Sequence, residues 1–110
     1  REIAIHPQLV TGLDWVQGTV ETGYGTIAAS WRRVEKGLDL RITIPTNTRA
    51  TLTLPTLGLE IFRLTESGVT LWEDGGYQPG IAGITEGRRT DQALEFVAGG
   101  GRYLFRLRGP

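Results

Sequence analysis

The sequence contains no cysteine and no methionine, and His6 is its single histidine. Disulfides and thiolate chemistry are therefore excluded, and so are metal sites built from several cysteine or histidine ligands. A bound metal would have to be a hard cation held by oxygen atoms, and we predict neither a metal nor another cofactor. Because methionine is missing and the first residue is Arg1, we expect a processed chain or a fragment of a longer protein.

The chain also lacks net charge and long apolar runs. Twelve Lys and Arg residues balance twelve Asp and Glu residues, so the formal net charge is zero. Non-specific phosphate binding requires a positive field, so we predict no nucleic-acid partner. No apolar run approaches the ~20 residues needed to span a bilayer, so we predict no membrane partner. The 110 residues predict one domain over 1–110, with 1–7 as a lead-in from an upstream domain.

The sequence is rich in alternating apolar and polar residues. Successive side chains of a strand point to opposite faces, so this alternation predicts half-buried antiparallel strands. Three consecutive runs in Gly25–Leu54 predict a three-strand meander, and Ala93–Val97 with Tyr103–Leu107 predict a closing hairpin. In the second arm of the hairpin the apolar residues are predicted to face inward and the arginines outward: Tyr103, Phe105 and Leu107 against Arg102, Arg106 and Arg108. Between them, Gly75–Asp91 is rich in glycine, and we predict an irregular excursion with one short strand near Ile81–Ile84.

The number and spacing of these runs determine the predicted fold class. About eight to ten short strands, with turn signals roughly every 8–12 residues, are typical of an all-β sandwich. We therefore predict an all-β fold in which two antiparallel sheets pack as a β-sandwich. The wiring could be Greek-key or jelly-roll.

Carboxylates are the first candidates for catalysis. Glycoside hydrolysis requires two of them about 5–10 Å apart. Glu73 and Asp74 are neighbours that would point to opposite faces of a strand, and the following Gly75–Gly76 favours a turn. No G-x-S-x-G, P-loop or dinucleotide motif occurs. We therefore predict that this chain alone is not an enzyme and has no catalytic residue.

Aromatic residues are better candidates for binding. If Leu71 points inward, strict alternation places Trp72 on the opposite, outer face. Trp72 and Tyr77 flank a glycine-rich stretch, and we predict a surface patch there that contacts sugar or another domain, with Glu73 beside it. Core packing is the competing interpretation for each ring. His6, one residue before a proline, is predicted to be a surface or interdomain contact.

Five short segments, taken in order, resemble the C-terminal β-sandwich domain of bacterial α-L-rhamnosidases. They are HP at His6–Pro7, GLDWVQGTVETGYG at Gly12–Gly25, I-x-x-S-W at Ile27–Trp31, IP-x-N-x-x-A at Ile44–Ala50 and GGGRYLF at Gly99–Phe105. The stretch Gly75–Asp91 departs from the family pattern. The resemblance implies that Trp15, Tyr24, Gly25 and Trp31 specify the fold, and Trp15 and Trp31 are predicted to be core residues.

The resemblance also implies that catalysis takes place in another domain of the parent enzyme. In the family, an upstream α/α-barrel domain hydrolyses terminal α-L-rhamnosides with inversion and carries the catalytic carboxylates. The expected function here is a non-catalytic C-terminal accessory domain that packs on and stabilises that barrel, its partner in the same parent enzyme. The alternative is a carbohydrate-binding module for rhamnose-containing glycans, with an aromatic sugar site around Trp72 and Tyr77.

Overall fold

A computed structural model describes residues 2–5, 15–22, 25–73 and 75–110, with side chains described from residue 25 onward. These ranges contain eleven strands and no helix, so no helix there could cross a bilayer. The strands are β1 (Glu2–Ile5), β2 (Trp15–Thr22), β3 (Gly25–Val34), β4 (Gly37–Ile44), β5 (Arg49–Pro55), β6 (Arg63–Glu66), β7 (Val69–Glu73), β8 (Gly76–Tyr77), β9 (Ile84–Arg89), β10 (Ala93–Ala98) and β11 (Gly101–Arg108).

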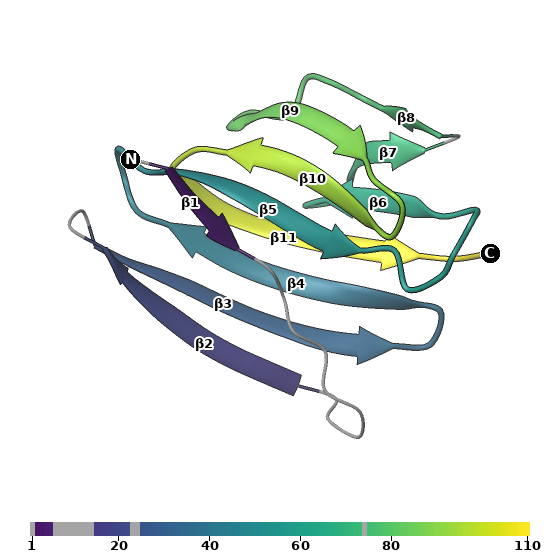
Figure 1. The fold of residues 1–110 in the computed structure, drawn as a ribbon, viewed down its shortest axis with the longest axis horizontal. Coiled ribbons are helices and arrows are strands. Elements are labelled where there is room, and N and C mark those ends of the chain that lie inside the picture. The colour runs from purple at the N-terminus through teal and green to yellow at the C-terminus, as the bar shows by residue number, and fades with distance from the viewer. Residues whose placement is uncertain (1, 6–14, 23–24, 74) are drawn as a thin grey trace.

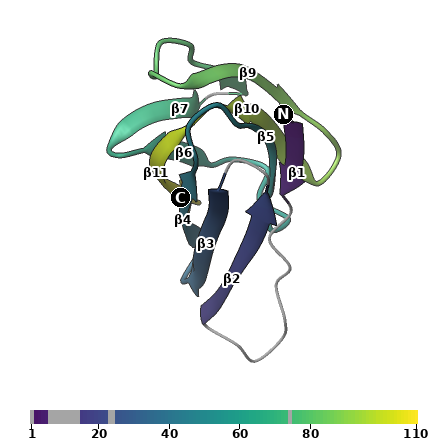
Figure 2. The same ribbon diagram turned by 90° about the vertical axis from the view of Figure 1, so that its left-hand side faces the viewer.

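The strands form two sheets that lie face to face, as Figures 1 and 2 show. One sheet has four strands in the order β1-β5-β10-β9, and the other has seven in the order β2-β3-β4-β11-β6-β7-β8. The described pairings are antiparallel except for β1, which runs parallel to β5 at the edge of its sheet. The predicted all-β, two-sheet sandwich is confirmed.

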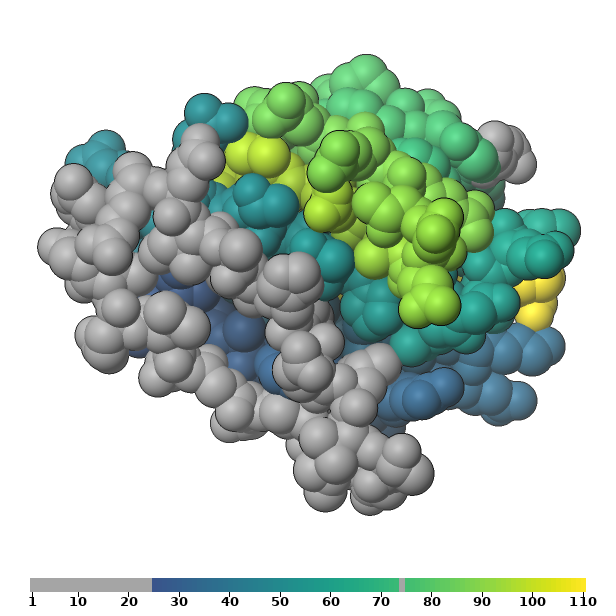
Figure 3. All heavy atoms as spheres, in the orientation of Figure 1, coloured from purple at the N-terminus to yellow at the C-terminus, as the bar shows by residue number. Residues whose placement is uncertain are grey.

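The core lies between the two sheets and follows from the alternation. In β4 and β11, each buried apolar residue alternates with an exposed or half-buried one. Full burial of each large apolar side chain stabilises the fold by about 1.5–3 kcal/mol. In the space-filling view, the yellow-green atoms of β10 lie at the front of the molecule, and yellow atoms of the C-terminal end of the chain show at the right-hand edge (Figure 3). The inward residues of the four central strands are Leu38, Leu40, Ile42, Ile44, Ala50, Leu52, Leu54, Leu94, Phe96, Ala98, Tyr103, Phe105 and Leu107.

Two connections that the sequence predicts as hairpins are crossings between the sheets. β4 pairs with β3 and β11, whereas β5 lies in the other sheet, so the predicted three-strand meander is wrong. β10 and β11 also lie in different sheets, so the predicted closing hairpin is wrong. Alternation specifies which side chains face the core, but both sheets offer the same apolar inner face, so it does not specify the hydrogen-bonded neighbour.

The two crossings lie against each other at one end of the sandwich. A Cβ atom on Gly100 would lie 2.8 Å from the carbonyl oxygen of Pro45, which real contacts do not allow. Asn47, in the first crossing, adopts a positive φ of 64°. Gly100 therefore allows the backbone of the second crossing to lie close to that of the first, in which Asn47 makes the turn.

The glycine-rich excursion contains two strands. β8 is short, and β9 begins at Ile84, so the predicted strand at Ile81–Ile84 is placed too early. The φ angles of Gly80 and Gly83 are +120° and +87°, which interrupt extended backbone before Ile84.

Candidate functional site

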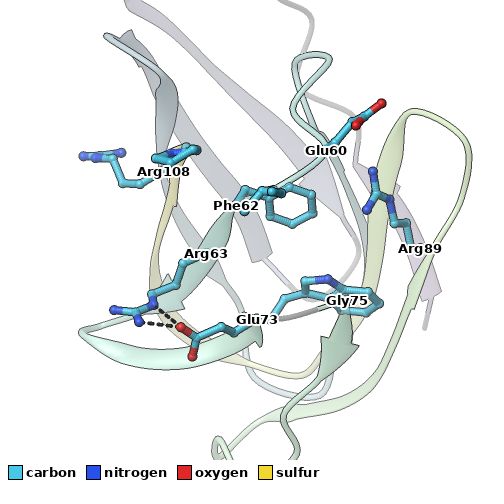
Figure 4. Close-up of a pocket in the computed structure, with 11 residues that line it drawn as sticks. Glu60, Phe62, Arg63, Glu73, Gly75, Arg89 and Arg108 are labelled. Atoms are coloured by element: carbon cyan, nitrogen blue, oxygen red, sulfur yellow. Dashed lines mark hydrogen bonds and ion pairs between the residues drawn. The ribbon is translucent and has the colours of Figure 1, made fainter.

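A pocket of about 590 Å³ lies beside β6 and β7, next to the end of β11. Figure 4 shows how its labelled residues surround the space. Phe62 and Trp72 contribute apolar surface, and the guanidinium groups of Arg63, Arg89 and Arg108 contribute positive charge. We call this site the β6–β7 pocket.

The carboxylate of Glu73 in the β6–β7 pocket is held by an arginine. Its Oε1 atom accepts hydrogen bonds from Arg63 Nε, at 2.9 Å, and from Arg63 Nη2. Both contacts are charge-assisted hydrogen bonds, so Glu73 and Arg63 form an ion pair at the pocket.

The other two arginines of the pocket also have partners. The guanidinium carbon of Arg89 lies 5.1 Å from the centroid of the Phe62 ring, a cation–π distance. Arg108 Nη2 donates to Asp39 Oδ1 at 2.7 Å. Sequence reasoning missed this cluster because its arginines come from β6, β9 and β11, which only the folded topology brings together.

Trp72 does not form the predicted surface patch, because only 5% of it is exposed. Both Leu71 and Trp72 are buried, although they are adjacent in β7. The register explains this: Leu64 is opposite Trp72 and Thr65 is opposite Thr70, so Leu71 is an extra residue in a β-bulge. The bulge breaks the alternation on which the prediction of an exposed Trp72 depended. The indole Nε1–H is buried and has no acceptor among the described residues.

Tyr77 is opposite Trp72 in the ladder between β7 and β8, but it lines a different pocket. The two rings pack on Phe96, with centroid distances of 6.5 Å from Trp72 and 6.3 Å from Tyr77. The second pocket, about 550 Å³, also includes Glu86 and Arg88. The structure therefore brings Trp72 and Glu73 into one pocket and places Tyr77 in another.

The other residues that the sequence singled out are either outside the described residues or only partly buried. His6, Tyr24 and Asp74 lie outside the described residues, and the side chain of Trp15 does too. Trp31 is half-buried and packs against the core cluster rather than within it.

A polar cluster lies away from the β6–β7 pocket, on β6 and β11. The buried Glu66 carboxylate accepts hydrogen bonds from Ser67 Oγ and from the Leu104 backbone N–H, the latter at 3.1 Å. The Tyr103 hydroxyl donates to the Gly99 carbonyl oxygen at 2.7 Å. Burial first, and the Glu66 charge second, raise the pKa of Tyr103 above its ordinary value. The first two contacts provide hydrogen-bond donors for the buried Glu66 carboxylate. The Tyr103 contact stabilises the crossing between β10 and β11.

The described residues contain no group of three or more His, Asp or Glu side chains placed to hold a metal ion. In the β6–β7 pocket, Glu73 pairs with Arg63 and Arg89 lies over the Phe62 ring. Arg108 pairs with Asp39, which lies outside the pocket. This arrangement can bind polar groups of a partner by hydrogen bonds.

The comparisons with known proteins identify the family. The chain superposes on the solved structure of alpha-L-rhamnosidase from Dictyoglumus thermophilum with a TM-score of 0.80 and 21% identity. That match covers 96% of this chain and 11% of the other, so the chain spans about a tenth of its length. No curated protein sequence matches. The model of the bacterial alpha-L-rhamnosidase C-terminal domain matches residues 1–66, more than half of the chain, and the chain therefore belongs to this family.

Proposed function

We propose that this chain is the non-catalytic C-terminal accessory domain of an α-L-rhamnosidase. The observation that carries the proposal is the family match over residues 1–66. The pairing of Glu73 with Arg63 supports it, because one of the two described carboxylate side chains that line the β6–β7 pocket is held in an ion pair. Cleavage of the rhamnoside then belongs to a catalytic domain elsewhere in the same protein.

The accessory role is to pack on that catalytic domain and stabilise it. The β6–β7 pocket offers a place for the contact, because it combines Trp72 and Glu73 with the rim residue Ile61, whose side chain is 75% exposed. Interfaces between domains of one chain are more polar than obligate interfaces, so a mixed apolar and charged edge suits such a contact.

Hydrolysis by the isolated chain tests the non-catalytic role. Residues 1–110 should release no nitrophenol from 4-nitrophenyl α-L-rhamnoside, at concentrations where an intact α-L-rhamnosidase gives a clear rate. Turnover by the chain that is abolished in Glu73→Gln or Glu60→Gln would contradict the proposal. The matched control is Glu95→Gln, because Glu95 lies on β10, outside the β6–β7 pocket.

A sugar site in the β6–β7 pocket is the second candidate function; it would include Trp72 but not Tyr77, which lines a different pocket. The observation in its favour is the β6–β7 pocket itself, lined by Trp72 with an indole N–H that lacks an acceptor among the described residues. It predicts that millimolar rhamnose changes tryptophan fluorescence and that Trp72→Phe abolishes the change. An unchanged spectrum would rule out this candidate and leave the accessory role intact.

A further inference from the structure

The described side chains on the outer face of the seven-stranded sheet carry an excess of positive charge. Outward positions alternate with the buried residues of β4 and β11, and the register carries the same parity into β3 and β6. The described carboxylates on this face are Asp39 and Glu73. Six arginines occupy it, which we call the arginine face: Arg32, Arg41, Arg63, Arg102, Arg106 and Arg108.

This excess is local, because the whole chain has zero net charge. Six arginines against two carboxylates leave a formal charge of +4 on the described side chains of the arginine face. The outer face of the four-stranded sheet differs, because Arg49 is paired with Glu86 and Arg88 with Glu95. The two faces of the sandwich are therefore electrostatically unlike.

The centre of the arginine face lacks an anion. Arg41 lies opposite Leu104 in the ladder, so Arg102 and Arg106 are its diagonal neighbours, about 7–8 Å away between Cα atoms. The side chains of Arg41 and Arg102 make no ion pair or hydrogen bond with any residue that the structure describes. Asp39 Oδ1 lies 2.7 Å from Arg108 Nη2 but 4.0 Å from Arg106 Nε. The Asp39 carboxylate is therefore closer to Arg108, at the edge of the arginine face, than to Arg106 at its centre. Crowded like charges of this kind are stabilised by a bound anion.

The use of arginine restricts the kinds of anion that this face can bind. A planar guanidinium matches carboxylate, sulfate or phosphate groups with two parallel hydrogen bonds. A stable protein interface needs an apolar core, and the centre of this face offers only the half-buried Leu104. Nucleic acid has a dense phosphate charge that is bound best by a protein with a net positive field, which this chain lacks.

We propose that the arginine face binds a polysaccharide that carries carboxylate groups, with Arg41, Arg102 and Arg106 as the central contacts. The choice of a glycan rests on the proposed function, since a domain of a glycoside hydrolase meets its substrate among glycans. The central contacts lie outside the β6–β7 pocket, which shares only Arg63 and Arg108 with the arginine face.

Affinity electrophoresis of residues 1–110 through gels containing polygalacturonate tests the proposal, with neutral dextran as the reference polymer. The wild-type chain should be retarded by polygalacturonate and not by dextran. The double variant Arg41→Gln/Arg102→Gln should lose roughly tenfold or more in affinity, since two guanidinium–carboxylate contacts are removed. Arg41→Lys/Arg102→Lys, which keeps the charge without the planar fork, should recover part of the binding.

The control is Arg49→Gln/Arg88→Gln, which removes the same charge from the four-stranded sheet and should bind as the wild type does. Equal loss in this control would show a general charge effect and overturn the proposal. No retardation of the wild type, or equal retention on double-stranded DNA, would overturn it too. None of these outcomes bears on rhamnoside hydrolysis, so failure here is distinguishable from failure of the proposed function.

Discussion

The two sheets of this sandwich are alike on their inner faces and different on their outer faces. Inside, β5 and β10 show the same alternation of buried apolar residues with more exposed ones as β4 and β11. Outside, the described side chains of the four-stranded sheet pair Arg49 with Glu86 and Arg88 with Glu95, whereas those of the seven-stranded sheet include six arginines but two carboxylates. The inner faces therefore explain why the chain folds, and the outer faces are where binding partners must be sought.

Truncation of a central ring in either sheet should give the largest effects. Phe105→Ala in β11 and Phe96→Ala in β10 should each lower the free energy of unfolding by about 3–5 kcal/mol, because both rings are at most 1% exposed. Urea denaturation would measure the loss. The control Ile61→Ala, at an exposed position, should change it by less than about 0.5 kcal/mol. If only one of the two phenylalanine variants lost less than about 1 kcal/mol of unfolding free energy, the two inner faces would not be equivalent.

Removal of a carboxylate from each outer face should give smaller and unequal effects. Asp39→Asn deprives Arg108 of its partner and leaves Arg106 without the nearest negative charge, and should cost about 1 kcal/mol at low salt. Glu95→Gln, which affects only Arg88, should cost about 0.5 kcal/mol or less. The difference should shrink in about 1 M salt, where exposed charges are screened. Equal losses at low salt would argue that the faces do not differ electrostatically.

Alkaline pH should give the smallest effect and probes the crossing that joins the two sheets. The pKa of Tyr103 is raised in the folded chain, so its contribution to stability is fully present below about pH 10. That contribution is lost as the pH rises through the folded-state pKa. Tyr103→Phe should therefore flatten the decline in unfolding free energy between pH 9 and 11. A decline as steep in the variant as in the wild type would assign the effect to other groups.

Much of the fold was predictable from the sequence because alternation reports burial directly. The inward side of β4 and β11 was correctly predicted, down to Tyr103, Phe105 and Leu107. The partner of each strand was not, because a crossing such as the one after Ile44 has the same local pattern as a hairpin. Sheet membership depends on long-range contacts, such as that of Gly100 with Pro45, which no local window contains.

The candidate site was less predictable for the same reason. Trp72 was expected at the surface because its neighbours were read with strict alternation, and the bulge at Leu71 reverses that reading. The arginines that face outward on β11 were visible in the sequence. Their proximity to Arg41 depends on the register between β4 and β11, which lie about sixty residues apart in the chain.

The most direct measurement for the central claim is heat inactivation of the complete gene product, with and without residues 1–110. The account predicts that the catalytic domain alone cleaves 4-nitrophenyl α-L-rhamnoside with an unchanged mechanism but loses its activity several times faster on heating, and that residues 1–110 alone give no rate. Equal inactivation half-lives for the two forms would contradict the stabilising role. Loss of bond cleavage itself in a correctly folded catalytic domain would contradict the non-catalytic assignment.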